Sequence, residues 1–247
     1  MFAPSAGYDR ALTIFSPDGR LYQVEYAVET VRRGTIAIGI KVKEGVVIAV
    51  EERVRKLQNP QFSQKIFQVD DHIMIAAAGF TPDARVLVDA ARTLAQNNRL
   101  IYDEEVEVET VAKELGDLAQ QYTQYAGVRP FGVSLIIAGI NKDGASLFIT
   151  DPSGTYLEYS AVAIGGGSDV ANEYLEQNYR EDLSLGDAID LALRCILRVN
   201  EGKVDPINVK VAYIERKDRV MKTLSREEIA SRLSSLAKEF EGKQNVK

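Results

Sequence analysis

Residues 35–52, TIAIGIKVKEGVVIAVEE, decide the fold. Two runs, TIAIGIKV (35–42) and GVVIAVEE (45–52), are rich in isoleucine and valine, which are typical of β-strands. The connection between them, Lys43-Glu44-Gly45, is short and contains a glycine, which predicts a β-hairpin. The stretch therefore places a pair of antiparallel strands early in the chain.

The rest of the chain continues in blocks of strands and blocks of helices. KIFQVD (65–70) and HIMIAAAG (72–79) predict a second strand pair, with Asp70-Asp71 at the turn. Further strands are predicted at 132–140, 145–151, 156–165, 207–215 and 220–225. The spacing of apolar residues predicts helices at 19–32, 82–98, 106–124, 168–179, 184–199 and 226–240.

This order of elements predicts an α+β fold. Strands joined by short turns favour antiparallel pairing, and two separate blocks of strands favour two packed sheets. Amphipathic helices must then cover the outer faces, which gives a four-layer α-β-β-α sandwich of two antiparallel sheets flanked by helices. No linker rich in proline, glycine or serine interrupts residues 1–247, so we expect one domain. Its sandwich would occupy 35–240, and a polar, disordered tail would follow at 241–247.

The composition argues against several classes of function. Of the 247 residues, 45% are hydrophobic and 27% charged, as in an ordinary globular protein. A net charge of −6 argues against nucleic acid or a membrane surface as a general partner. We find neither an apolar secretion signal nor a membrane span, and the single cysteine, Cys195, lies in an apolar run, so we expect a cytoplasmic protein. With one histidine, His72, we expect neither a metal nor a cofactor.

The most suggestive polar residues lie at the ends of three predicted strands. Thr35 opens the first strand, Glu51 ends the second and Lys65 opens the third, so neighbouring strands would bring them within reach of one another. A threonine at a chain N-terminus can use its own amine as a general base, helped by a lysine and a carboxylate. That chemistry requires cleavage of the Gly34–Thr35 bond. The alternative is a threonine that starts a strand, beside a Glu–Lys pair at the sheet edge.

For three other segments, a structural role is a simpler explanation than a catalytic or binding role. The glycine run at 165–168 lacks the lysine of a phosphate-binding loop, so it predicts a tight turn with Ser168 or Asp169 as a helix N-cap. The acidic residues 103–107 predict a negative first turn that complements a helix dipole. His72 has no cluster of polar residues around it in the sequence and is interpreted as structural.

The segment QQYTQYAGVRPFG (120–132) allows two interpretations. Gly127 and its neighbouring proline are typical of the end of a helix. Alternatively, Tyr122, Tyr125 and Arg129 beside a fixed loop suit a surface that contacts another chain, because tyrosine and arginine are enriched at interfaces.

Several blocks of the sequence resemble α-type subunits of the 20S proteasome core particle, archaeal members most of all. YDRALTIFSPDGRLYQVEYA (8–27) is similar to the α-subunit signature, and GTIAIGIKVKEGVVIAVEERV (34–54) continues it. Similar blocks follow in order: TPDARVLVDAAR (81–92), QQYTQYAGVRPFGVSLIIAGI (120–140) and LFITDPSGTYLEYSAVAIGGGS (147–168). The resemblance implies a sandwich of the N-terminal nucleophile hydrolase type.

The resemblance also implies a place in a larger assembly. Seven copies would form a ring with other α subunits, and two such rings would cap two inner rings of β subunits, whose peptidase sites act on unfolded proteins. In β-type relatives a propeptide is removed before the threonine that matches Thr35, with a carboxylate and a lysine near Glu51 and Lys65. Here residues 13–34 resemble the retained turn and ring-top helix of α subunits. The resemblance therefore implies a blocked Thr35 and no peptidase activity in this chain.

The same resemblance assigns a gate and a docking pocket. Residues 1–12 would lie over the axial pore. The gate residues would be Tyr8, Asp9 and Arg10 as a stabilising motif, Pro17 as a reverse-turn proline, and Glu25 and Tyr26 as helix residues that engage this turn. Leu21, Gly34 and Lys65 match a pocket between neighbouring subunits that receives the C-terminal tails of hexameric regulatory ATPases. A lysine there suits a terminal carboxylate.

Three hypotheses follow for function. The leading one is a non-catalytic gating and scaffold subunit of a threonine-type peptidase complex. The alternative is a self-processing β-type threonine peptidase that uses Thr35, Glu51 and Lys65. A third is a stand-alone amidase of the N-terminal nucleophile type.

Overall fold

The hairpin at residues 35–52 forms and lies inside a five-stranded sheet. The computed structural model describes residues 10, 11, 13–59 and 65–244. The first strand of the hairpin, β1 (Ala37–Val42), pairs antiparallel with β2 (Gly45–Glu51). Their sheet has the order β10-β9-β2-β1-β8. Its other strands are β8 (Ala161–Ile164), β9 (Val209–Glu215) and β10 (Met221–Thr223).

The second sheet also has five antiparallel strands, in the order β3-β4-β5-β6-β7. They are β3 (Ile66–Asp70), β4 (Ile73–Gly79), β5 (Val133–Ile140), β6 (Ala145–Thr150) and β7 (Tyr156–Glu158). All eight residues of β5 are buried, because both faces of this central strand are covered. That burial explains its unbroken apolar sequence.

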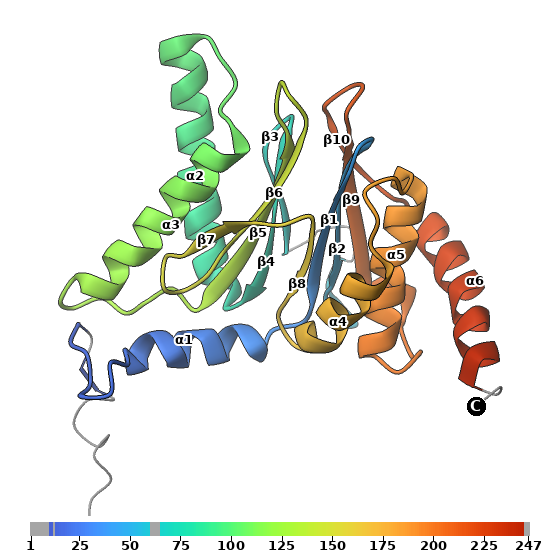
Figure 1. Ribbon diagram of the computed structural model, residues 1–247, viewed down its shortest axis with the longest axis horizontal. Helices are drawn as coiled ribbons and strands as arrows, with labels where there is room; N and C mark the ends of the chain where they lie inside the picture. Colours follow the sequence, from blue (N-terminus) through green and yellow to red (C-terminus); the bar gives the residue numbers. More distant parts are fainter. Residues whose placement is uncertain (1–9, 12, 60–64, 245–247) are drawn as a thin grey trace, which may run out of the picture.

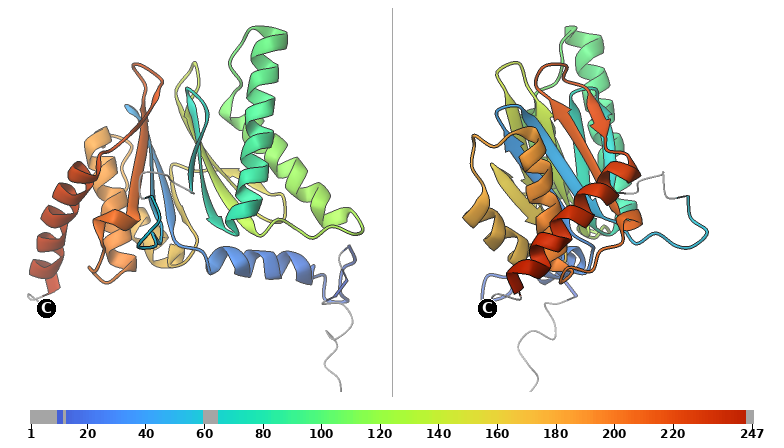
Figure 2. Two further views of the ribbon diagram at one scale, coloured as in Figure 1. Left: turned by 180° about the vertical axis from the view of Figure 1, so that it is seen from behind. Right: turned by 90° about the vertical axis from the view of Figure 1, so that its right-hand side faces the viewer.

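Helices cover the outer faces of both sheets (Figure 1). Two of them pack on the sheet that contains β5, and two pack on the sheet that contains β1, with a third outside them (Figure 2). The first pair is α2 (Thr81–Tyr102) and α3 (Val108–Gln124), and the other three are α4 (Ser168–Asn178), α5 (Leu185–Val199) and α6 (Arg226–Gln244). A short 3-10 helix, η1 (Pro206–Asn208), precedes β9. This arrangement is the predicted four-layer sandwich.

The two ends of the sandwich differ. Helix α1 (Tyr22–Arg32) lies across one end, against β4 and β5 (Figure 1). We call this the α1 end; β1 begins there and β2 ends there. We call the opposite end the far end; it holds the β3–β4 and β9–β10 turns and the last turn of α2.

Alternation along the strands separates the three cores. In β1 and β2, Ala37 and Val50 face the other sheet, whereas Ile38 and Ala49 face α5. The third core lies between the β5 sheet and helices α2 and α3. Because side chains on a strand alternate, the face that each end residue occupies follows from these assignments.

One predicted strand is in fact two. The segment 156–165 divides at Tyr159-Ser160, and its halves enter different sheets as β7 and β8. The amide of Tyr159 donates to the carbonyl of Leu147 at 2.9 Å, whereas the amide of Lys41 donates to the carbonyl of Ser160 at 2.8 Å. The chain therefore crosses from one sheet to the other between adjacent residues, which alternation alone does not reveal.

Several helix boundaries also differ from the prediction. Helix α1 starts at Tyr22, later than predicted, because Leu21 keeps an extended backbone after the preceding turn. Helix α2 runs to Tyr102, where Asp103 with φ 54° ends it. Helix α6 runs to Gln244, into the segment predicted as a disordered tail, because glutamate, lysine and glutamine are good helix formers.

Candidate functional site

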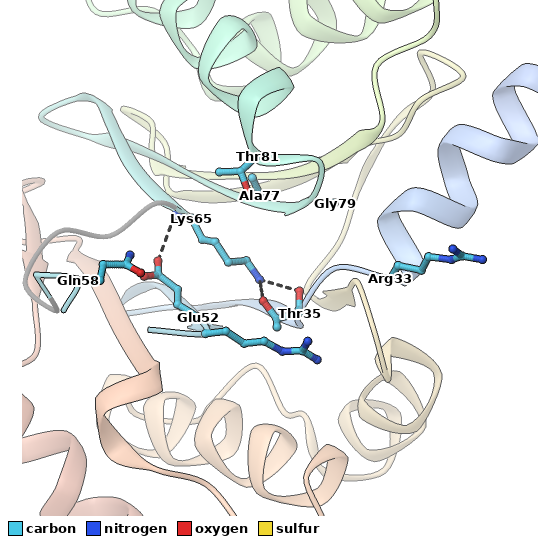
Figure 3. A pocket seen from close by; sticks show the side chains of 9 residues that line it. Arg33, Thr35, Glu52, Gln58, Lys65, Ala77, Gly79 and Thr81 are labelled. Atoms are coloured by element: carbon cyan, nitrogen blue, oxygen red, sulfur yellow. Dashed lines mark hydrogen bonds between the residues drawn. The ribbon is translucent and has the colours of Figure 1, made fainter. Parts of the chain in front are cut away.

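A polar pocket opens at the α1 end, where β1 begins, β2 ends and β3 begins (Figure 3). Its volume is about 230 Å³. The lining residues are Arg33, Thr35, Glu52, Arg53, Gln58, Lys65, Ala77, Gly79 and Thr81. Two of the three residues predicted from the strand ends therefore line one pocket.

Lys65 is the buried centre of this pocket, with 8% of its surface exposed. Its ammonium nitrogen lies 2.8 Å from the Thr35 hydroxyl oxygen and 2.6 Å from the Thr35 carbonyl oxygen. The carbonyl oxygens of Ile36 and Glu51 are 3.0 and 3.2 Å away. Lys65 thus binds both strand ends of the first hairpin, and the predicted closeness of Thr35 and Lys65 is observed.

Glu51 takes a different position from the one expected. It offers its main-chain carbonyl to Lys65 and to the hydroxyl of Thr35, which donates at 2.5 Å. Its carboxylate instead accepts a hydrogen bond from the side-chain amide of Asn200 at 3.1 Å. The reason is alternation: Glu51 follows Val47 and Ala49, which face the α5 side of the sheet.

Glu52 is the carboxylate on the same side as Thr35, and the sequence reasoning missed it. It is buried, and its Oε1 accepts a hydrogen bond from the amide of Lys65 at 3.1 Å. The register of β1 and β2 pairs Ala37 with Val50, and continued by two residues it puts Thr35 opposite Glu52. That pairing follows from the hairpin once its turn is fixed, so the signal was present in the sequence.

Burial changes the chemistry of the lysine. The pKa of Lys65 is lowered to about 7, because removal from water disfavours its charged form, while Glu52 and Glu51 act in the opposite direction. The surrounding oxygen atoms are ordered by the strands themselves. Lys65 therefore links the start of β1 to the end of β2 through hydrogen bonds to carbonyl oxygens of the chain itself.

Thr35 has no free amine while the chain continues through Gly34. Its nitrogen is then part of a peptide bond, and an amide cannot act as the general base that an N-terminal threonine needs. Gly34 is itself fixed, because its carbonyl accepts from the Gly166 amide at 2.8 Å and its amide donates to Val31 at 2.9 Å. A Cβ at Gly34 would lie 2.5 Å from the nitrogen of Gly79, so only glycine fits.

The predicted docking residues do not all meet within one chain. Gly34 and Lys65 both lie at the α1 end, near the C-terminus of α1. Leu21 is the N-cap at the opposite end of this 11-residue helix, which spans about 16 Å at 1.5 Å per residue. A pocket that contains all three residues would need two copies of the chain.

The predicted gate residues are only partly described. Tyr8 and Asp9 lie outside the described residues, and Arg10 is exposed. Pro17 lies in a turn closed by a hydrogen bond from the Gly19 amide to the Ser16 carbonyl at 2.8 Å.

An arginine links this turn to α1. Arg20 follows the turn, and its Nε donates to the carboxylate of Glu25 at 2.8 Å. The next residue, Tyr26, is 51% exposed and lines a second groove with Phe80 and Pro130. Glu25 therefore engages the turn segment through Arg20, and Tyr26 faces outward.

The loop after α3 is held from inside the chain. Arg129 forms a two-pronged ion pair with Asp83 in the first turn of α2, at 2.6 and 2.9 Å. Tyr122 packs its ring on Phe131 at 4.3 Å, whereas Tyr125 is 59% exposed. Of the residues predicted for a contact surface, Tyr125 is accessible and Arg129 has an internal partner. Gly127 supplies the turn, with φ 86°.

Two local predictions were wrong. The N-cap of α4 is Gly167, with φ 77° and no side-chain hydrogen bond, and Ser168 is already helical. The acidic residues 103–107 precede α3 and do not form its first turn, because α3 begins at Val108. Among the described residues no three histidine, cysteine or carboxylate side chains are grouped to hold a metal ion. No described helix is both long and apolar enough to cross a membrane.

Comparison with known proteins assigns the chain to a family. The sequence profile described as "Proteasome subunit" matches residues 31–214, and the profile of the N-terminal signature of A-type proteasome subunits matches residues 8–29. The chain belongs to the proteasome subunit family. Its two antiparallel five-stranded sheets flanked by helices are the predicted α+β fold of that family, which is thereby confirmed.

Curated relatives narrow the assignment to one branch of the family. Proteasome subunit α of Methanocaldococcus jannaschii is 53% identical over 227 residues, which cover 92% of this chain and 87% of that protein. The proteins of the same name from Archaeoglobus fulgidus and Methanothermobacter thermautotrophicus are 51% and 49% identical, and cover 93% and 94% of both chains. The chain is therefore an α-type member, and α-type membership supports a non-catalytic subunit of the 20S core.

Proposed function

We propose that the chain is a gating subunit of the proteasome core. It forms the outer seven-membered rings, controls the passage of unfolded proteins to the threonine peptidase sites of the β subunits, and docks a hexameric regulatory ATPase. The observation that carries the proposal is the α-type signature at residues 8–29, ahead of Thr35. A chain that keeps this segment holds the Thr35 nitrogen in a peptide bond and leaves residues 1–12 for another task.

The two ends of the sandwich suit the two kinds of partner. The described start of the chain, the turn at Pro17 and helix α1 all lie at one end (Figure 1). At the far end, α2 extends beyond the sheets and exposes Leu100, Ile101 and Tyr102 by 82%, 69% and 68%. Exposed apolar side chains in a row are typical of a protein interface. With the gate at the α1 end, the far end faces the β subunits.

The docking pocket would form between neighbouring α subunits. Leu21 and Gly34 lie at opposite ends of α1, so Leu21 of one copy would meet Gly34 and Lys65 of the next. Replacement of Lys65 by alanine is expected to weaken stimulation by the ATPase while rings still assemble. Unchanged stimulation would remove Lys65 from the docking pocket.

The self-processing peptidase remains a second candidate, because the Thr35 hydroxyl lies 2.8 Å from Lys65 Nζ. It predicts a mature chain that begins at Thr35. The intact mass of the chain purified with its β partner separates the two functions: the full mass supports the gating subunit, and a mass that starts at Thr35 supports the peptidase.

Deletion of residues 2–12 tests the gate. In the assembled particle, the rate of peptide hydrolysis is expected to rise several-fold, because the deletion removes a steric barrier to substrate entry. No peptidase residue is changed. Deletion of residues 245–247, at the other terminus, serves as the matched control and should leave the rate unchanged. Equal rates for the 2–12 deletion and the intact particle would contradict gating.

A further inference from the structure

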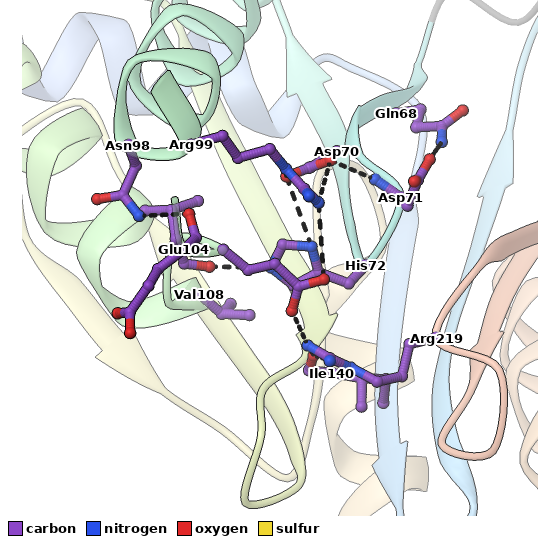
Figure 4. A network of polar contacts seen from close by, with 12 residues as sticks. Gln68, Asp70, Asp71, His72, Asn98, Arg99, Glu104, Val108, Ile140 and Arg219 are labelled. Carbon is purple, nitrogen blue, oxygen red and sulfur yellow. Dashed lines mark hydrogen bonds and ion pairs between the residues drawn. The ribbon is translucent and has the colours of Figure 1, made fainter. Parts of the chain in front are cut away.

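A chain of ionic contacts binds several elements together at the far end (Figure 4). Asp70, at the end of β3, accepts from Arg99 on α2 through two hydrogen bonds of 2.9 and 3.0 Å. Arg99 also lies 3.6 Å from Glu105 in the α2–α3 loop, and Glu105 pairs with Arg219 of the β9–β10 turn. Arg219 donates in turn to the carbonyl of Ile140, at the end of β5.

His72 lies inside this network with one nitrogen unused. Its side chain is 1% exposed, and Nε2 is 2.9 Å from the carbonyl oxygen of Val106. A carbonyl only accepts, so Nε2 carries the hydrogen. Nδ1 is buried and has no hydrogen-bond partner in the described part of the chain, and Oδ2 of Asp70 lies 3.7 Å away.

This geometry favours uptake of a proton. In the neutral ring, the lone pair of Nδ1 faces a carboxylate, and a buried acceptor without a donor is costly. A proton on Nδ1 would attract the Asp70 carboxylate, and once the 3.7 Å separation closes to hydrogen-bond distance the ring would donate to Val106 on one side and to Asp70 on the other. A hydrogen bond between two charged groups is stronger than one between neutral groups. His72 is the only histidine of the sequence, and imidazole is the side chain that ordinarily changes charge between about pH 5 and 8.

We propose that His72 is a proton-operated clamp that tightens the α2–α3 loop and the last turn of α2 onto the β3–β4 turn as pH falls. It holds Val106 of the loop directly, and through Asp70 it holds Arg99, the residue before the exposed Leu100. The clamp belongs to a single chain and does not depend on the gate or on docking.

The ion pair of Asp70 and Arg99 beside the imidazole stays charged over the same range. Burial acts to raise the pKa of Asp70, but the hydrogen bonds from Arg99 and from the Asp71 amide outweigh it and hold that pKa below its ordinary value. Arg99, with its pKa raised by Asp70, stays protonated. The remaining charges on the packed elements are Asp71 on the β3–β4 turn, Glu104 and Glu105 on the α2–α3 loop, Lys142 on the β5–β6 turn and Arg219 on the β9–β10 turn.

The test uses the full chain, in which the single histidine gives an unambiguous signal. Isotope-labelled histidine read by NMR reports the protonation of each ring nitrogen between about pH 8 and 5. Amide hydrogen exchange of residues 97–107, corrected for the intrinsic effect of pH, reports the clamp. We expect Nδ1 to gain a proton over this range, together with a slowing of exchange by about tenfold, the equivalent of one charge-assisted hydrogen bond.

Matched variants separate the clamp from general effects of charge. His72→Gln keeps a donor for the Val106 carbonyl but cannot take up a proton, so its corrected exchange should not depend on pH. Asp70→Asn should lose the dependence as well, whereas Asp71→Asn, whose side chain contacts Gln68, should retain it. A ring that stays neutral to pH 5 in the unmodified chain would overturn the proposal even if a variant failed to fold. So would a His72→Gln chain that keeps the pH dependence, or equal behaviour of the two aspartate variants.

Discussion

Each end of the sandwich buries a titratable side chain, and the two side chains differ in how completely they are hydrogen-bonded. At the α1 end, four oxygen atoms of the described residues lie within 3.2 Å of the Lys65 side-chain nitrogen. At the far end, His72 has one hydrogen-bonded nitrogen and one without a partner in the described residues. Both side chains are less than a tenth exposed.

The two groups differ in how far their polar atoms are used within the chain. Thr35, Lys65 and a carboxylate are the residue types of a threonine nucleophile, but here the hydroxyl donates to the Glu51 carbonyl and the lysine donates to strand ends. Both donors make hydrogen bonds within the chain. We call Thr35, Lys65 and the ends of β1 and β2 that they link the joint at the α1 end. We expect a response to pH instead at His72, whose Nδ1 has no hydrogen-bond partner in the described residues.

The strongest test of the joint at the α1 end is Gly34→Ala. The added Cβ would lie 2.5 Å from the nitrogen of Gly79, and backbone must move to make room, which would shift Thr35 away from Lys65. We expect a loss of about 3 kcal/mol or more in the free energy of unfolding. Urea denaturation followed by tyrosine fluorescence, at one protein concentration, measures it.

Gly186→Ala is the matched control for this substitution. Gly186 lies in the first turn of α5, and the nearest atom to an added Cβ is 3.7 Å away. Alanine there should be neutral or stabilise by up to about 1 kcal/mol. If both variants unfolded at the same urea concentration, the joint would not be rigid and the contrast between the two ends would fail.

The pH dependence of stability tests the buried lysine. Its folded pKa of about 7 lies below the ordinary value of 10.5, so between these limits the unfolded chain binds a proton that the folded chain has released. Stability should therefore rise with pH from about 7 toward 10, by at most about 1.4 kcal/mol per pH unit. Below pH 7 both states are protonated and this contribution is constant.

Comparison with Lys65→Met isolates that effect from other titrations. The free energy of unfolding is measured for both chains from pH 6 to about 10, a range that starts below the folded pKa of Lys65 and approaches its ordinary value of 10.5. The difference between the two chains should slope upward above pH 7 in favour of lysine. Parallel curves would show that Lys65 keeps its proton in the folded state, stabilised by its surrounding oxygen atoms.

The sequence allowed the sandwich, the hairpin and the meeting of Thr35 with Lys65 to be predicted, because these depend on local patterns and on short turns. It did not reveal that the predicted strand at 156–165 serves two sheets, since neither glycine nor proline interrupts the segment at Tyr159-Ser160. The end of the second predicted strand indicates Glu51 as the carboxylate, whereas the register of the hairpin puts Glu52 opposite Thr35 and on the same face of the sheet. Contacts such as Asp83 with Arg129 join residues that are 46 positions apart, and no local signal announces them.

The smallest effect is expected at the far end, from Arg99→Lys. Arginine gives Asp70 two parallel hydrogen bonds, whereas lysine can supply one, and the arginine side chain is 43% exposed, so solvent reduces the loss to about 1 kcal/mol or less. Arg92→Lys is the control, because Arg92 makes a single 3.2 Å hydrogen bond to the exposed carboxylate of Asp89, beside one of 3.0 Å to the Gln68 carbonyl. A double-mutant cycle with Asp70→Asn measures the coupling. If the coupling free energy of Arg99 with Asp70 equals that of Arg92 with Asp89, the ionic contacts contribute no more than an ordinary surface ion pair. The clamp around His72 would then lose its link to α2.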